Sequence, residues 1–305
     1  MAVTCVMTRG WHSLLRRVRL LAGGLLETAT QASEVGFLQV LDIDAGQACR
    51  YPGAYARLRR GALHAIVVRG VYSPAQLAPV LERLERHDPP FVQTWFPEKF
   101  RSWFYGVNVN LSEPGLPGYF ELEGVFHAQL RQAFAGAPPL VERVSAILSA
   151  LDDGRPFLAP PGPRPDTRYL FTTLRGHAEG GYIPPHFDNE QALRPGFAHL
   201  REIVEADMSS FVLTLSMAQA GGALEVFDCR CEPGDARMIS ADGAERPRID
   251  HLASVAFRVP AGDMIIVDSG RYLHRVTPVV GASRRWTACS FIARARRGDV
   301  NYCWG

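Results

Sequence analysis

Residues 181–190 read Gly-Tyr-Ile-Pro-Pro-His-Phe-Asp-Asn-Glu, and the interpretation of the whole chain starts from this stretch. One residue separates His186 from Asp188. In an extended strand, residues i and i+2 point to the same side, so the imidazole and the carboxylate converge on one small volume. The spacing therefore predicts a pair of chemically useful groups on one face of a strand.

A second motif lies far downstream, where the apolar residues 262–268 are followed by His274. Two histidines and one carboxylate on one face of a metal leave the other positions open, and non-haem Fe(II) oxygenases use this arrangement. In the alternative interpretation, His186 and His274 are core histidines that satisfy local hydrogen bonds. Their combination with Asp188 and with two nearby arginines favours the metal-ligand interpretation.

The two arginines are Arg284 and Arg285, and the apolar residues 286–292 continue from them as a predicted strand. An arginine is always charged and can hold a carboxylate by two parallel hydrogen bonds. A metal triad with a buried arginine on the next strand suits a dicarboxylate that chelates the metal at one end. Either arginine is a candidate for this role.

Across residues 167–294 the chain resembles the Fe(II)/2-oxoglutarate-dependent dioxygenases, in the broad group that includes the prolyl hydroxylases. The resemblance rests on five motifs: His186-x-Asp188, Gly221-Gly222-Ala223-Leu224, Pro260-x-Gly262-Asp263, His274-x-Val276-x-Pro278-Val279 and Arg285-Trp286. Together these motifs are fairly specific, whereas each alone is weak.

The resemblance implies that His186, Asp188 and His274 bind Fe(II), with 2-oxoglutarate and O₂ as co-substrates. It also implies that Arg285, rather than Arg284, binds the distal carboxylate of 2-oxoglutarate. Halogenating relatives replace the carboxylate ligand with Gly or Ala and so open a site for chloride. Because Asp188 is present, the expected reaction is hydroxylation of an unactivated C–H bond, with release of succinate and CO₂. Desaturation and ring closure use the same ligands and remain alternatives.

The expected fold is α+β with a mainly β core, a double-stranded β-helix or jelly-roll of two facing sheets. Turn residues and apolar patterning predict eight strands, at 167–175, 182–188, 209–217, 222–228, 253–259, 263–268, 271–276 and 285–294. The intervening residues 190–206 are expected to form a helix over the mouth of the barrel, either as a lid or as a surface excursion.

The N-terminal half is expected to be a helical and mixed region packed against this core. Helices are predicted at 12–33, from Ser73-Pro74 onward, at 117–134 and at 139–151, with strands at 37–41 and 65–68 and an aromatic loop at 88–115. The proline-rich residues 158–165 cannot form helix or central strand. They divide residues 1–157 from a catalytic core at 158–305, within one continuous domain.

Arg175 lies on the strand before the metal motif. It either faces inward, where it would pair with a substrate carboxylate, or faces outward, and the sequence leaves both open. His177 and His251 have no spacing that links them to the triad, and we interpret them as structural or surface residues. Asp263 and Asp268 are expected in turns beside a strand.

Composition limits the possible partners. The 305 residues are 47% hydrophobic and 21% charged with a net charge of +2, so no global field would recruit nucleic acid. Arginines interrupt the apolar residues near the N-terminus, so neither a signal peptide nor a membrane span is expected. The six cysteines lack a zinc spacing and are expected to be free thiols in a cytoplasmic protein.

The expected partner is a small molecule such as an amino acid or a natural-product intermediate, free or attached to a carrier protein. The sequence does not determine the oligomeric state. Three other functions remain: a cupin-like metal enzyme that does not use 2-oxoglutarate, a non-catalytic binding protein, and a nucleic-acid demethylase. The cupin-like enzyme would usually have a third histidine ligand, and the binding protein would usually have a broken triad. The demethylase would depend on the short basic run at 294–297.

Overall fold

The computed structural model describes residues 4–6, 32–112, 116, 118–231 and 249–305. The helix predicted at 12–33 falls almost entirely outside these residues; of this range only Ala32 and Ser33 are described, and a strand starts at Ser33. Among the described residues, no helix is both long and apolar enough to cross a lipid bilayer.

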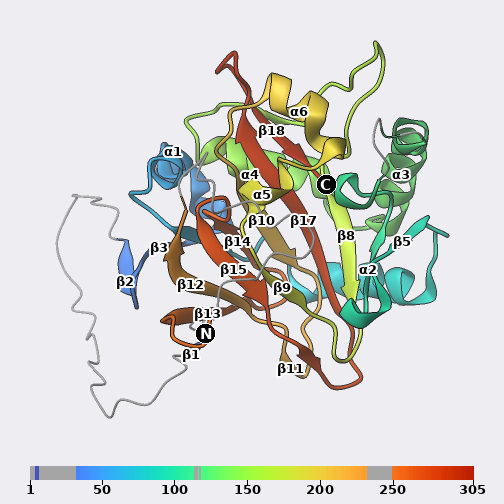
Figure 1. Ribbon diagram of the computed structural model, residues 1–305. Helices are drawn as coiled ribbons and strands as arrows, with labels where there is room; N and C mark the ends of the chain where they lie inside the picture. The colour runs from blue at the N-terminus through green and yellow to red at the C-terminus, as the bar shows by residue number, and fades with distance from the viewer. Residues whose placement is uncertain (1–3, 7–31, 113–115, 117, 232–248) are drawn as a thin grey trace.

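Two sheets, in which most neighbouring strands are antiparallel, face each other and make up most of the molecule (Figure 1). The large sheet has eleven strands. In spatial order nine of them are β2 (Ser33–Val35), β3 (Leu38–Asp44), β4 (Ala65–Arg69), β14 (Met264–Val267), β10 (Ser209–Thr214), β17 (Arg285–Arg294), β8 (Thr173–His177), β6 (Ser102–Tyr105) and β5 (Gln93–Trp95). The other two are β18 (Asn301–Trp304), which pairs with β17, and β7 (Phe157–Leu158).

The small sheet carries the strand with the His186 motif at one edge. Its order is β1 (Thr4–Val6), β13 (Ser254–Arg258), β12 (Leu224–Arg230), β15 (Tyr272–Val276) and β9 (Ile183–His186). A separate two-stranded ribbon joins β11 (Ala220–Gly221) to β16 (Val279–Val280). The expected jelly-roll of two facing sheets is therefore confirmed.

Helices lie mainly in the N-terminal half. They are α1 (Ala54–Arg59), α2 (Pro74–Arg86), α3 (Tyr119–Ala133), α4 (Leu140–Ala150), α5 (Asp188–Gln191) and α6 (Ala198–Ile203), with 3₁₀ turns η1 (Ala45–Arg50), η2 (Glu98–Phe100), η3 (Val109–Leu111) and η4 (Pro195–Phe197). The predicted start of α2 is confirmed, because Ser73 caps it through a reciprocal pair of hydrogen bonds with Gln76.

Side chains alternate between the two faces of the large sheet, so one face packs against the helices and the other faces the small sheet. Trp286 and Ala288 of β17 belong to the apolar core under the helices, whereas Arg285 and Thr287 point to the opposite side. In β14, which β10 separates from β17, Ile265 belongs to a second core that the small sheet completes. The space between the sheets is thus apolar near β14 and polar near β17.

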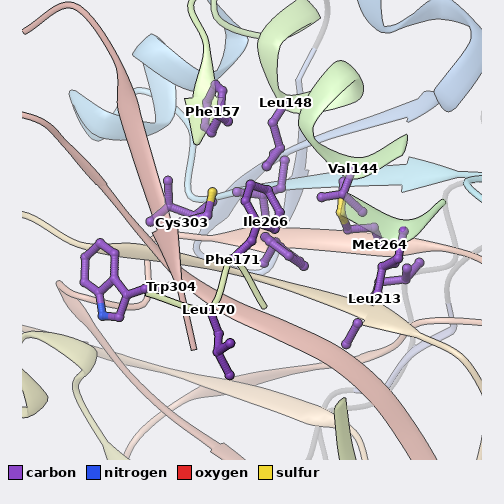
Figure 2. Close-up of a cluster of buried hydrophobic side chains, with 14 of the residues drawn as sticks. Val144, Leu148, Phe157, Leu170, Phe171, Leu213, Met264, Ile266, Cys303 and Trp304 are labelled. Carbon is purple, nitrogen blue, oxygen red and sulfur yellow. The ribbon is translucent and has the colours of Figure 1, made fainter. Parts of the chain in front are cut away.

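The larger core joins the helical region to the sheet. Figure 2 shows Val144 and Leu148 of α4 meeting Leu213, Met264 and Ile266 from the large sheet. All five side chains are 0% exposed. Their burial stabilises the sheet from the side away from the motif residues.

Three predicted segments differ from the structure. Residues 88–115 are not a single loop, because β5 and β6 within them extend the large sheet beyond β8. The strand expected from residue 167 begins only at Thr173. The strand expected at 182–188 ends at His186, and Asp188 opens α5.

Strands β2, β3 and β4 are part of the large sheet, since β4 pairs with all four residues of β14. Residues 190–206 contain the short helix α6, and its function as a lid stays a prediction. The division at residue 157 likewise stays a prediction.

Gly262 provides a sharp test of how the two halves of the chain are joined. Its φ is +90°, and an added Cβ would lie 2.1 Å from the Tyr72 carbonyl oxygen. We expect Gly262→Ala to lower the free energy of unfolding by at least about 2 kcal/mol, because the left-handed backbone alone disfavours Ala by about 1–2 kcal/mol. Urea denaturation measures this change.

Gly46→Ala is the matched control, because an added Cβ there has no neighbour within 4 Å and its φ is not positive. An equal loss of stability in both variants would contradict the close contact at Gly262.

Candidate active site

The three predicted ligands come together where β9 meets β15. His186 and His274 are directly opposite each other in this antiparallel pair, with ring centroids 4.3 Å apart. Asp188 follows the end of β9, but the intervening Phe187 keeps extended angles (φ −107°, ψ 139°). The carboxylate therefore stays on the same side as the imidazole of His186, as the i, i+2 spacing predicted.

The geometry of this cluster suits a metal ion. An Asp188 carboxylate oxygen, Oδ1, lies 3.4 Å from His186 Nε2 and 3.7 Å from His274 Nε2. One donor atom from each residue can be chosen so that all lie within 4.8 Å of one another. Two imidazoles and one carboxylate make a donor set of the kind that non-haem Fe(II) enzymes use.

Backbone carbonyls orient both imidazoles. His186 Nδ1 donates to the Pro184 carbonyl at 2.8 Å, and His274 Nδ1 donates to the Tyr272 carbonyl at 3.0 Å. A carbonyl only accepts, so Nδ1 must carry the proton and Nε2 keeps its lone pair free. Metal-binding histidines commonly show this outer hydrogen bond, because it fixes the tautomer and the ring orientation.

The protonation states also favour metal binding. Burial alone would raise the pKa of Asp188, but the nearby His274 and His186 lower it to about 2. Burial, together with the neighbouring His186, lowers the pKa of His274 to about 4. Near neutral pH the carboxylate is therefore ionised and the His274 imidazole is neutral, which are the forms that bind a metal.

The two adjacent arginines have opposite environments. Arg284 is exposed, and its Nη1 donates to Glu85 at 2.5 Å. Arg285 is only 7% exposed, and no described carboxylate forms an ion pair with it. Burial lowers the pKa of Arg285 to about 10, so the group is still charged at neutral pH. Of the pair, only Arg285 is a buried cation that lacks an anion.

A pocket between the sheets opens beside Arg285. Thr214, Gly222 and Leu224 line it together with Arg285. Gly222 has a positive φ, and an added Cβ would lie 2.7 Å from Arg285 Cδ, so the glycine leaves room for the arginine side chain. This contact explains the second glycine of the Gly221-Gly222 motif.

The triad does not line this pocket but lies next to it. Val226 pairs with His274 across β12 and β15, and Leu224 pairs with Val276 two residues farther along. Leu224 is two residues from Val226 along β12, so its side chain is on the same face of the small sheet as the metal cluster and next to it. The pocket extends from this row towards Arg285.

Arg175 and His177 are both buried in the same polar face. His177 pairs with Arg285, and Arg175 pairs with Thr287, so the two side chains of β8 lie beside those of β17. Arg175 thus faces inward, the first of the two orientations left open. His177, interpreted from the sequence as a structural or surface residue, is fully buried on the same side of β8 as Arg175, as their i, i+2 relation implies. Asp263 and Asp268 lie outside the cluster, in contact with Arg69 and Arg271 respectively.

Residues 37–305 match the family model described as the carrier-protein-independent halogenase WelO5. The chain belongs to this family. The Fe(II)/2-oxoglutarate-dependent oxygenase group expected from the sequence is thereby confirmed, and Fe(II), 2-oxoglutarate and O₂ are its cofactor and co-substrates. No curated protein sequence matches the chain.

A comparison with solved structures found further matches. An N-substituted L-amino acid dioxygenase from Burkholderia ambifaria AMMD has a TM-score of 0.52 at 14% identity, covering 83% of this chain and 91% of that one. A Pseudomonas putida prolyl-4-hydroxylase has a TM-score of 0.40 at 16% identity, covering 80% of this chain and 100% of that one. At 14% identity, the likeness to the dioxygenase concerns the fold.

Removing any triad side chain is expected to weaken metal binding strongly in buffer that contains no halide. In His186→Ala, Asp188→Ala and His274→Ala, we expect Mn(II) affinity to fall by more than about 100-fold, since losing even an outer partner of a ligand lowers affinity about 10- to 100-fold. Isothermal titration calorimetry measures the affinity. His199→Ala, whose ring stacks on Tyr169 away from the cluster, is the control and should bind as wild type. Unchanged affinity in the triad variants would remove the metal assignment.

Proposed function

We propose that this protein is an Fe(II)/2-oxoglutarate-dependent hydroxylase acting on an unactivated C–H bond of a free small molecule. His186, Asp188 and His274 would hold the iron, and Arg285 would hold the distal carboxylate of 2-oxoglutarate. Bound iron supplies the chemistry of substrate oxidation, in which O₂ is reduced while 2-oxoglutarate becomes succinate and CO₂ and the substrate gains a hydroxyl group.

The position of Asp188 is the observation that favours hydroxylation over halogenation. The family model is named for a halogenase, and halogenating relatives of these oxygenases have Gly or Ala at this position. Here the carboxylate is 3% exposed and lies beside both histidines. An ionised carboxylate in this place would occupy the position where a halide would bind and would repel it.

The family description also supports a free substrate. It specifies independence from a carrier protein, which speaks against the carrier-bound substrate that the sequence left open. The chain's own contribution is to orient the reactants. The carbonyls of Pro184 and Tyr272 hold the imidazoles in place, and the two sheets keep the Arg285 side chain buried beside the pocket.

Product analysis tests the reaction type. Wild-type protein is supplied with Fe(II), ascorbate, 2-oxoglutarate, isotopically labelled O₂ and excess chloride and bromide, together with a panel of small molecules. We expect substrate-dependent succinate and a product that has gained one labelled oxygen atom, detected by mass spectrometry. A halogenated product from the wild type would contradict the proposal.

Asp188→Gly is the informative variant in the same assay. It removes the carboxylate and leaves space for a halide ion beside the two histidines. We expect it to lose most hydroxylation, and halide-dependent recovery of turnover would identify the vacated position as the one that a halide occupies.

Arginine variants test co-substrate binding. We expect Arg285→Gln to raise the 2-oxoglutarate concentration for half-maximal binding by about 100-fold, because losing one partner of a buried charge pair costs about 2–5 kcal/mol. Arg284→Gln, at the exposed ion pair with Glu85, should change it by less than about 3-fold, since exposed pairs contribute about 1 kcal/mol or less. The reverse result would move the role to Arg284. Titration of the Mn(II)-loaded protein with 2-oxoglutarate measures both.

A further inference from the structure

The polar face between the sheets holds a second buried cation. Arg175 is 9% exposed, and no described carboxylate forms an ion pair with it. Burial lowers the pKa of Arg175 to about 10, and the charge of Arg285 acts in the same direction. A buried charge is stable only when it is paired, so two neighbouring cations without anions indicate that ligands supply the negative charge.

The two guanidinium groups lie in different parts of the space between the sheets. Arg285 extends past Gly222 into the pocket beside β12, and Arg175 does not line that pocket. Arg175 instead lies over the rings of Phe96 and Phe104, with its guanidinium carbon 4.3 Å and 5.1 Å from the two ring centroids. One carboxylate of 2-oxoglutarate held by Arg285 therefore leaves Arg175 available for a second anion.

Three buried nitrogen atoms around Arg175 have no hydrogen-bond partner among the residues that the structure describes. They are Nε of Arg175 and both ring nitrogens of His177, whose side chain is fully buried. Arg175 makes one long hydrogen bond, from Nη2 to Ser102 Oγ at 3.4 Å. Burial and the two arginines lower the pKa of His177 well below its usual value, so the ring is neutral and offers one donor and one acceptor. Buried polar atoms are normally satisfied, so these atoms are available to a ligand.

A half-buried row of aromatic rings continues from this polar base to the start of β9, the strand that carries His186. Phe96 packs against Phe100, and Phe100 packs against Tyr182 with ring centroids 5.3 Å apart. Tyr182 immediately precedes β9, which ends at His186. Small-molecule sites combine such apolar walls with a few polar groups that fix the orientation of the ligand.

We propose that the substrate of this enzyme is a carboxylic acid with an apolar body. Its carboxylate would bind Arg175, with His177 as an additional hydrogen-bond partner, and its apolar body would lie along Phe96, Phe100 and Tyr182 towards the metal cluster. This inference rests on the proposed hydroxylase function and adds the chemical class of the substrate to it.

Binding without turnover tests the subsite. The full-length protein is loaded with Mn(II) and 2-oxoglutarate without O₂ and titrated with phenylpropanoate, indolepropionate and N-acetylleucine, each compared with its primary amide. We expect wild type to prefer the acids by about 10- to 100-fold, since a hydrogen bond to a charged group contributes about 1.5–3 kcal/mol. Equal affinity for acid and amide in every pair, or binding of no compound, would overturn the proposal.

Variants separate this subsite from 2-oxoglutarate binding. Arg175→Gln should remove the preference for acids while changing 2-oxoglutarate affinity by less than about 3-fold, and Arg284→Gln should keep both at wild-type values. Arg175→Lys keeps the charge without the planar fork and should retain part of the preference. Loss of 2-oxoglutarate affinity in Arg175→Gln would overturn the proposal by assigning Arg175 to the co-substrate.

The same titrations distinguish failure of the subsite from failure of the hydroxylase function. Mn(II) and 2-oxoglutarate binding by wild type are measured before any acid is added and report on the hydroxylase proposal alone. A protein that binds both yet shows no preference for acids overturns only the carboxylate subsite.

Discussion

The pairing of β9 with β15 is the interaction on which the candidate site depends. It places His186 directly opposite His274, and the extended Phe187 then brings Asp188 to both imidazoles. A strand slipped by one residue would turn every side chain to the other face. β9 is the edge strand of its sheet, so its position depends on β15 and on the backbone bond from Asp188 to the Ser269 carbonyl at 2.9 Å.

The space between the sheets has an apolar part and a polar part, and this division separates stability from function. Val67, Val226 and Ile265 help to fill the apolar part, where burial stabilises the fold. In the polar part, Arg175 and Arg285 are buried without described carboxylate partners, which is unfavourable for the protein alone. Ligands that bring carboxylates would offset this penalty, so the fold and its ligands are energetically linked.

Family membership indicates the class of enzyme, whereas the residues of the site indicate which reaction it catalyses. The family match covers residues 37–305 and establishes the type of oxygenase. In the proposed function the outcome of the reaction depends on a single position, because the Asp188 carboxylate would fill the coordination place that a halide needs. Under this proposal a family described by halogenation includes a chain that hydroxylates, so function has to be argued from the site rather than from the fold.

Local spacing placed His186 and Asp188 on one side of a strand, and turn and cap residues predicted the jelly-roll strands and the helix from Ser73. The choice of His274 and of Arg285 came from the resemblance to the dioxygenases. The residues alone did not separate Arg284 from Arg285, orient Arg175, or show that His177 is buried beside it. Those outcomes depend on strand register and on which face of β8 and β17 lies between the sheets. Only the tertiary structure decided them, because the burial of a side chain and its ion-pair partners among the described residues depend on segments that are distant in the chain.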